Sequence, residues 1–255
     1  MSVSTAIYPA QARQPGASTG YVEKAVAISR LLAHSFAGFE ELYDTEAPQP
    51  SPAQVLQYQL KLLAALQWRA STLGRGLLTI TAVDARTGEL AGAANVTTGL
   101  ALAEAVEHVE LEHGQAAATV SNMAVAEKFR RRGLGRLLLE ACERAAAQCS
   151  PPATLMALVV YRYNDPAINL YETSGYRLDE TWTDLKWAEA AERGRAGGAR
   201  RQLMLKPLNG AAWPRTRPAL EREREEEEAR DAAERRRREA RQAERQRQEQ
   251  QRGRP

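Results

Sequence analysis

Apolar residues in the first part of the chain recur every three to four positions, which is the spacing of an amphipathic helix. One such segment runs from Tyr21 to Phe36. A second begins at Ser51, where Ser-Pro-Ala-Gln has the form of a capping box with proline at the first helical position. Its apolar positions are Leu56, Leu60, Leu63 and Leu66. We therefore predict two helices, joined by an acidic loop over 40–50 and preceded by an unstructured segment, 1–19.

The pattern then changes to the period of two that is typical of strands. Leu78–Val83 alternates apolar residues with threonine, Asp84–Glu89 has the composition of a turn, and Leu90–Thr97 runs back, so we predict a hairpin. Ala116–Val125 is a further strand. Thr154–Tyr163 is almost continuously apolar, which is typical of a central strand covered on both faces.

Helical spacing returns on either side of this central strand. Leu137–Ala147 precedes it, and a short helix, Asp165–Tyr171, follows it and ends before Gly175. The expected buried positions around the first of these helices are Leu134, Leu137, Leu138, Ala141, Cys142 and Ala145. We predict two closing strands, Arg177–Trp187 and Gln202–Lys206, separated by a polar insertion over 188–201. This order of elements predicts one α/β domain with a mixed sheet.

The basic character of the chain comes from its C-terminal end. The 255-residue chain has a formal net charge of +3. Residues 215–255 hold 14 arginines and 11 acids, whereas the positive and negative charges of residues 1–214 cancel. The globular part therefore gives no reason to expect nucleic-acid binding, and only the tail could contact nucleic acid. Glu/Arg pairs four residues apart predict a solvent-exposed helix over 219–245 that gives way to disorder. We assign this charged tail to 209–255.

Several kinds of chemistry are disfavoured. Cys142 and Cys149 lie nearly two helical turns apart, too far for a disulfide, which indicates a reducing compartment. No apolar run reaches the roughly 18 residues of a membrane span, so we expect no membrane contact, and we also expect no metal. The first 20 residues contain no acid, which weakly resembles an organelle transit segment, although a plain disordered terminus accounts for the same composition.

The strongest chemical signal is a basic, glycine-rich turn between a predicted strand and a predicted helix. Its sequence is Arg130-Arg131-Arg132-Gly133-Leu134-Gly135-Arg136. Glycine lets the backbone bend tightly and approach a ligand, and the N–H groups at a helix start attract an anion. We call this segment the basic loop. A phosphate site and a solvated basic helix start are the two interpretations of the loop taken by itself.

A second motif follows the central strand: Asn164-Asp165-Pro166-Ala167-Ile168-Asn169-Leu170-Tyr171-Glu172-Thr173-Ser174-Gly175-Tyr176. Met123-Ala124-Val125, the basic loop and this motif follow one another along the chain. Together they resemble the GNAT superfamily of acyl-CoA-dependent N-acetyltransferases. The motifs of that family are Arg/Gln-x-x-Gly-x-Gly/Ala and Asn-x-x-Ala-x-x-Leu-Tyr-x-x-x-Gly-Phe/Tyr. The resemblance covers residues 20–207, and we assign an N-acetyltransferase domain to 20–208.

The resemblance implies a mixed, mostly antiparallel sheet, flanked by helices, whose two central parallel strands splay apart to admit acetyl-CoA. It assigns to this co-substrate Met123, Ala124, Val125, Arg130, Arg131, Arg132, Gly133, Leu134, Gly135, Arg136, Asn164, Asp165, Pro166 and Tyr171. The pantetheine arm would follow the backbone of Met123–Val125, and the pyrophosphate would occupy the basic loop. Other interpretations are open for some of these residues. Met123 and Val125 also fit ordinary strand core, and at least one of the three successive arginines fits a solvated position. Asn164 fits a helix N-cap equally well.

Tyr171 is the residue to which the resemblance assigns chemistry, as the general acid that protonates the departing thiolate. A core tyrosine is the alternative interpretation. The two positions at which relatives place a general base correspond to Thr119 and Val159, neither of which can act as one. A water chain could instead carry the proton of the amine to one of four upstream side chains, Glu110, Glu112, His108 or His113. Each of these also fits a solvated position on the surface. Backbone carbonyls could also end that chain.

The function implied is that of an acyltransferase, an N-acetyltransferase in which a primary amine of a protein or peptide attacks acetyl-CoA directly. Ser121–Val125, Thr183–Trp187 and Leu203–Lys206 resemble the plastid branch of the family in plants and algae, whose members acetylate lysine side chains and protein N-termini. This branch implies a location in the chloroplast stroma, with the cytoplasm as the alternative. We expect a monomer. A non-catalytic acyl-CoA-binding sensor is the alternative function.

Overall fold

The computed structural model of the protein describes residues 3–9, 18–36, 51–73, 76–98, 109–111, 116–193 and 200–216. The chain divides into two compact units, Met1–Pro214 and Arg215–Pro255. The predicted acidic loop over 40–50 and the predicted tail helix over 219–245 lie outside the described residues. No helix within the described ranges is long and apolar enough to cross a membrane.

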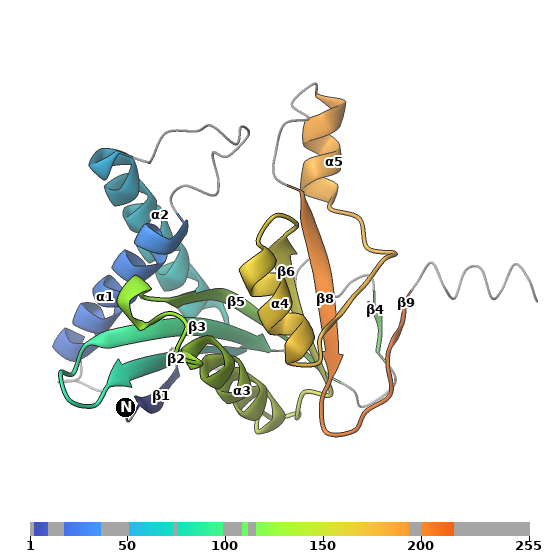
Figure 1. Ribbon diagram of the computed structural model, residues 1–255, viewed down its shortest axis with the longest axis horizontal. Coiled ribbons are helices and arrows are strands. Elements are labelled where there is room, and N and C mark those ends of the chain that lie inside the picture. The colour runs from blue at the N-terminus through green and yellow to red at the C-terminus, as the bar shows by residue number, and fades with distance from the viewer. Residues whose placement is uncertain are drawn as a thin grey trace, which may run out of the picture. The chain divides into compact units, whose positions relative to one another are not determined.

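The described elements follow the predicted order closely (Figure 1). The strands are β1 (Val3–Pro9), β2 (Leu77–Asp84), β3 (Leu90–Thr98), β4 (Val109–Glu110), β5 (Ala117–Val125), β6 (Leu155–Tyr161), β7 (Arg177–Leu178), β8 (Arg201–Pro207) and β9 (Arg215–Thr216). The helices are α1 (Ser18–Phe36), α2 (Pro52–Leu73), α3 (Leu134–Ala147), α4 (Asp165–Thr173) and α5 (Leu185–Glu192). The predicted capping box at the start of α2 is confirmed, because Ser51 N–H donates to Gln54 Oε1 at 2.8 Å and Gln54 N–H donates to Ser51 Oγ at 3.3 Å.

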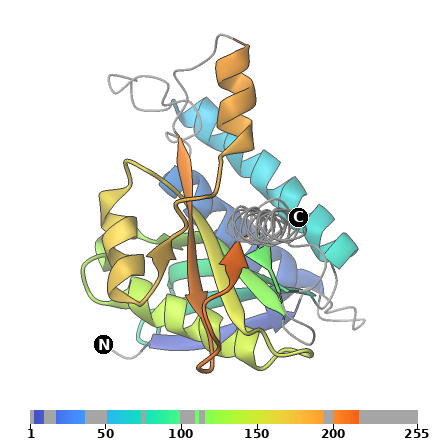
Figure 2. The same ribbon diagram turned by 90° about the vertical axis from the view of Figure 1, so that its right-hand side faces the viewer.

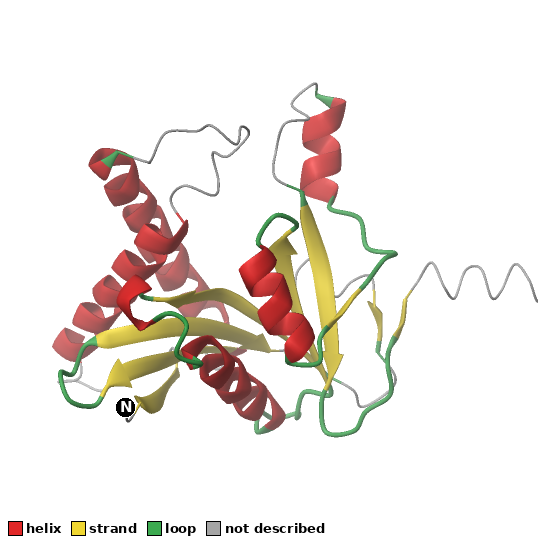
Figure 3. Ribbon diagram, viewed as in Figure 1, coloured by secondary structure: helices red, strands yellow, loops and turns green. Residues whose placement is uncertain are grey.

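Seven strands form one mixed sheet in the order β1-β2-β3-β5-β6-β8-β7 (Figure 3). Only the pair β5 and β6 at its centre is parallel, and the other neighbours are antiparallel. Helices α1 and α2 lie on one side of β2, β3 and β5, and α3 lies on the other side (Figures 1 and 2). The predicted fold class, a mostly antiparallel sheet with central parallel strands and flanking helices, is confirmed.

The two parallel strands are paired over only part of their length. Their register runs from Ala117 opposite Leu155 to Val120 opposite Leu158. Beyond Val120 both strands continue, β5 to Val125 and β6 with β8 beside it, without pairing with each other. Figure 1 shows the two ribbons diverging from this point. The expected splay is therefore present, and it leaves one edge of β5 without a strand partner.

Strand β5 contains a bulge where the splay begins. Ala124 lies opposite Ala93 and Ser121 opposite Asn95, so β5 has one residue more than β3 between these pairs. Asn122 takes up the extra length in the left-handed region, at φ +51°. A bulge bends the strand and strengthens its twist. It therefore redirects the end of β5 away from β6.

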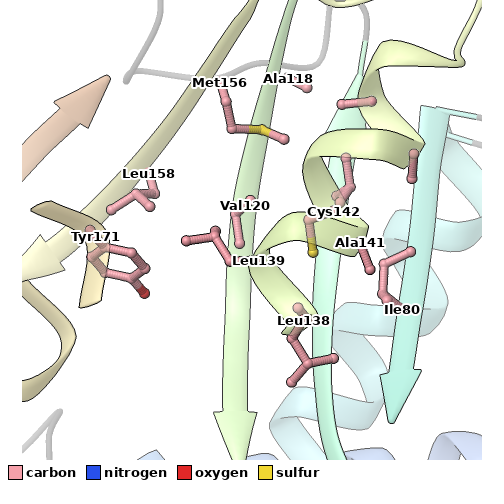
Figure 4. Packing of buried hydrophobic residues seen from close by; sticks show 14 of the residues in the cluster. Ile80, Ala118, Val120, Leu138, Leu139, Ala141, Cys142, Met156, Leu158 and Tyr171 are labelled. Carbon is pink, nitrogen blue, oxygen red and sulfur yellow. The ribbon is translucent and has the colours of Figure 1, made fainter. Parts of the chain in front are cut away.

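The main core lies between the sheet and α3 (Figure 4). Leu134, Leu138, Cys142 and Ala145 are buried as expected from their helical spacing. Leu137 was wrongly expected in this face and is 44% exposed. It lies at the edge of the apolar stripe, where burial depends on the width of the surface that the helix meets.

Two further expectations were wrong. The first was the absence of structure over 1–19, which is wrong for residues 3–9, because β1 pairs with β2 from Val3 opposite Asp84 to Pro9 opposite Leu78. The second was a long closing strand over 177–187. Strand β7 ends at Leu178 and α5 begins at Leu185, because Asp184 caps the helix by accepting the N–H of Trp187. Part of the insertion expected over 188–201 is therefore the end of a helix.

Candidate active site

The basic loop connects the end of β5 to the start of α3. After Val125 the chain makes a short 3₁₀ helix, Glu127–Phe129, and then a turn with two left-handed residues, Arg131 at φ +60° and Gly133 at φ +78°. Gly133 is the N-cap of α3 and provides no side-chain cap. The N–H groups of the first turn of a helix have no partner within the helix, so they are donors for an anion here.

The arginines of the loop have different surroundings. Arg130 Nε donates to the carbonyl oxygen of Val125 at 3.0 Å, which ties the loop to the end of β5. Arg132 lies over the ring of the buried Phe129, with 6.0 Å between the guanidinium carbon and the ring centroid. Arg131 and Arg136 are exposed. All four arginines are exposed around the turn, and Arg130 is in addition tied to the end of β5.

The loop and the second motif contact each other in space. A methyl group added at Gly135 would come within 3.1 Å of Leu170 Cδ2, so glycine allows α4 to pack against the first turn of α3. Met123, Val125 and Leu134 pack in the same core cluster as Tyr171. The structure thus brings together the β5 segment, the basic loop and the tyrosine that the sequence placed in one site.

Asn164 begins α4. Its side-chain Oδ1 accepts the N–H of Ala167 at 3.3 Å, which is the geometry of an N-cap. Asp165 and Pro166 follow in the first turn and are exposed. Of the two roles that the sequence left open for Asn164, the structure contains the helix cap, and contact with a cofactor stays a prediction.

Tyr171 is buried within the core between α4 and α3, and only 8% of it is exposed. Figure 4 shows its ring beside Leu158. The ring of Tyr176 is tilted against it, with 5.9 Å between the centroids. Burial, with a smaller contribution from Cys142, raises the pKa of Tyr171 to about 12. The phenol is therefore neutral at physiological pH and carries a proton that it can donate.

A general base is not evident. Thr119 is half-buried on β5, between Thr97 on β3 and Ala157 on β6, and Val159 faces Leu203 in the β6–β8 register. His108, Glu112 and His113 lie outside the described residues, as does the side chain of Glu110. In the part of the chain that is described, no group of three His, Cys, Asp or Glu residues is placed to hold a metal ion.

Sequence reasoning missed three polar residues near the bulge. Ser121 lies next to Asn122, Asn95 lies opposite Ser121, and Arg69 of α2 donates from Nη1 to Ser121 Oγ at 3.5 Å. Alternation along β2 and β3 does place polar residues on one face, but it cannot show that helices cover that face.

The model of the acetyltransferase (GNAT) family matches residues 38–176. Similar solved structures include NAA60 of Arabidopsis thaliana in complex with a bisubstrate analogue (16% identity, 82% of this chain and 100% of that chain, TM-score 0.47). Others are the PaiA N-acetyltransferase of Thermoplasma acidophilum in complex with coenzyme A (14%, 82% and 100%, 0.48) and a putative acetyltransferase of the GNAT family from Desulfovibrio desulfuricans (16%, 81% and 99%, 0.48). No curated protein matches the sequence.

Proposed function

The chain belongs to the acetyltransferase (GNAT) family, and from this premise we propose that it transfers the acetyl group of acetyl-CoA to a primary amine of a protein or peptide. The observation that carries the proposal is the convergence of the basic loop, the unpaired edge of β5 and Tyr171 at the place where β5 and β6 separate.

The residues around the splay fit the parts of acetyl-CoA. Donors at the start of α3, together with the exposed Arg131 and Arg136, suit the pyrophosphate and the outer phosphate. The edge of β5 beyond Val120 suits the amides of the pantetheine arm, because a strand edge pairs with any extended chain of amides.

The proposed reaction needs one proton donor and one proton acceptor. The neutral amine attacks the thioester carbon, the C–N bond forms and the C–S bond breaks. The thiolate takes the proton of Tyr171, the cationic nitrogen releases its proton through water to the solvent, and the solvent returns a proton to the Tyr171 phenolate. In water a thiol has a pKa near 8.5 and a phenol near 10, so the transfer from Tyr171 to the thiolate would be slightly unfavourable. Burial raises the pKa of Tyr171 to about 12, so the transfer becomes favourable only if the site also desolvates the thiolate that receives the proton.

The resemblance to the plastid branch supports lysine side chains and protein N-termini as acceptors, and a plastid location as part of the same proposal. At pH 7, deprotonating a lysine costs about 4.6 kcal/mol and deprotonating an N-terminal amine about 1.4 kcal/mol. An N-terminus is thus the less demanding acceptor for a site without an evident base.

A thiol-release assay with acetyl-CoA and three peptides tests the function. One peptide has a free N-terminus and blocked lysines, one has a blocked N-terminus and a free lysine, and one has both blocked. We expect release with the first or second peptide and none with the third. Binding of acetyl-CoA without release for any acceptor would instead indicate the sensor function.

Replacing Gly133 by alanine should weaken acetyl-CoA binding about tenfold, because a side chain at φ +78° costs about 1–2 kcal/mol and alters the turn. Gly88→Ala is a matched control. Gly88 lies at φ +71° in the β2–β3 turn, and, as at Gly133, a methyl group there would meet no atom within 4 Å. Both variants should lose similar stability, but only Gly133→Ala should raise the Kd for acetyl-CoA measured by calorimetry. An equal effect of both on Kd would contradict a role of the loop in binding.

A further inference from the structure

The sheet face beneath α1 and α2 is polar at its centre. Residues opposite each other in an antiparallel pair point to the same face, as do residues two apart along a strand. By this rule the face contains Thr79, Thr81, Asn95, Thr97, Thr119 and Ser121. Ala93 lies on the same face and packs against Ile28 and Leu32 of α1. The opposite face, with Ile80 and Val96, packs against α3.

Three of these polar side chains are buried with an atom that has no hydrogen-bond partner. Thr81 is 3% exposed, Asn95 1% and Thr97 2%, and the unpartnered atoms are the two Oγ1 atoms and Asn95 Nδ2. The other end of the Asn95 amide is held, because Oδ1 accepts the hydroxyl of Thr79 at 3.2 Å. Buried polar atoms in proteins nearly always have partners, so these atoms retain hydrogen-bonding capacity that a polar group from outside the chain could use.

A cation lies over the same face. Arg69 of α2 is half-buried, and it donates to Ser121 Oγ, next to Asn95 in the register. Among the described residues, none of the ion pairs involves Arg69. The guanidinium, the amide of Asn95 and the hydroxyls of Thr97 and Ser121 can all donate, and no carboxylate of the described strands accompanies them. We call these four residues the donor cluster.

One member of the donor cluster lies beside the place where β5 and β6 separate. Val120 is the last residue of β5 that pairs with β6, and Ser121 follows it. Ser121 therefore borders the gap that opens between β5 and β6 beyond this pair. Tyr171 and the start of α3 belong to the core on the opposite face. An amine that attacks a thioester held in the gap can therefore approach from the side of Ser121 without displacing the groups that hold the co-substrate.

We propose that the donor cluster binds a carboxylate of the acceptor, so that the enzyme selects amines that have a carboxylate close to the reacting nitrogen. This inference rests on the proposed function and adds to it the chemical class of the substrate. The guanidinium supplies charge and a pair of parallel donors, and the amide and hydroxyls supply the remaining hydrogen bonds of the carboxylate oxygens. A neutral amide in place of the carboxylate would bring N–H groups to a site that already consists of donors.

The test compares acceptors that differ only in carboxylate against carboxamide, by kcat/KM for thiol release. The three pairs are alanine and alaninamide, an amidated tripeptide that begins with aspartate or asparagine, and an N-acetylated lysine peptide with aspartate or asparagine after the lysine. We expect the acidic member to be preferred at least about tenfold in one pair, the usual effect of a charge-assisted hydrogen bond. In Arg69→Met the preference should fall to about one, and Arg69→Lys should retain part of it.

Lys61→Met is the matched control, because it removes a cation from the exposed side of the same helix. It should leave the preference unchanged. A purely structural role of Arg69 would lower both members of a pair equally and leave their ratio intact, which would overturn the proposal.

The failure of the proposal and that of the proposed function are distinguishable. Thiol release with equal rates for both members of every pair overturns the carboxylate site and leaves the acetyltransferase. If no acceptor releases thiol, the proposed function fails, and calorimetry of the same pairs with the CoA-saturated protein decides the site. Binding of the acidic member that is lost in Arg69→Met supports it, and equal or absent binding of both members overturns it.

Discussion

Tyr171→Phe is expected to lower kcat by about a hundredfold to ten-thousandfold while the Kd for acetyl-CoA stays unchanged, which is the range for loss of a positioned general acid. The substitution removes one oxygen from a ring that is buried between α4 and α3, so the packing against Leu158 and Tyr176 is kept. Turnover is measured by thiol release with the best acceptor, and Kd by calorimetry.

Tyr176→Phe is the matched control for this variant. The same oxygen is removed from the neighbouring buried ring, whose hydroxyl lies beside the carboxylate of Glu143. This hydroxyl has no part in the proposed reaction, so turnover should stay within about twofold of wild type. Equal losses in the two variants would show that the hydroxyl of Tyr171 has no special part in the reaction.

The raised pKa of Tyr171 also fixes the sign of a pH effect. With its pKa at about 12, the folded protein keeps the phenol protonated across the pH range in which a free tyrosine, with a pKa near 10, ionises. Tyr171 therefore causes no alkaline fall in kcat below about pH 11. The unfolded chain ionises first, so the stability that this group contributes is complete below about pH 10 and is lost as pH rises toward 12. The pKa values of Tyr163, Tyr176 and Cys142 are raised as well, so the loss due to Tyr171 is the difference between wild type and Tyr171→Phe in urea unfolding at about pH 8 and pH 11.

Asp184→Ala should cost about 3–5 kcal/mol of unfolding free energy, the usual penalty for removing one partner of a buried ion pair. The side chain of Asp184 is 1% exposed, and its two oxygens form hydrogen bonds to two residues. Oδ2 accepts the backbone N–H of Arg201 at 2.9 Å and Nε at 3.0 Å, while Oδ1 accepts Nη2 of the same guanidinium. The cap of α5 is lost with the same carboxylate.

Chemical denaturation measures this effect, with Glu189→Ala as the control on the same helix. Glu189 pairs with Arg193 at 3.6 Å at the surface, so its loss should cost less than about 0.5 kcal/mol. Burial alone would raise the pKa of Asp184, but the hydrogen bonds and charge of Arg201 outweigh it and lower that pKa. The stabilisation is therefore present above about pH 4 and lost as pH falls below it. Comparable losses in the two variants would contradict the importance of the buried pair.

The parts of the fold that were predicted correctly are those determined by local pattern. The capping box at Ser51, the β2–β3 hairpin and the central strand β6 each follow from spacing and turn composition within a few residues. The two site motifs could also be located, because a helix start with glycine and arginine has the same chemistry in any fold. Their contact at Gly135 and Leu170 could not be derived from spacing alone, and came from the family resemblance.

The misses have tertiary causes. Strand β1 is short and lies in a sequence rich in small polar residues, and it is a strand because β2 offers it an unpaired edge. Helix α5 depends on Asp184, whose capping role is inseparable from its pairing with Arg201, distant in sequence. The bulge at Asn122 is a mismatch between two strands, so neither strand alone encodes it.

The short parallel pairing, from Ala117 with Leu155 to Val120 with Leu158, has a mechanical consequence. It divides the sheet into a leaf of β1, β2, β3 and β5 and a leaf of β6, β8 and β7, joined in their backbone hydrogen bonding at one end only. A ligand that forms hydrogen bonds to the edges of both leaves links them at the end where β5 and β6 are not paired. The free energy of ligand binding then also stabilises the sheet against separation of the two leaves. A change that favours their separation therefore weakens ligand binding by the same free energy.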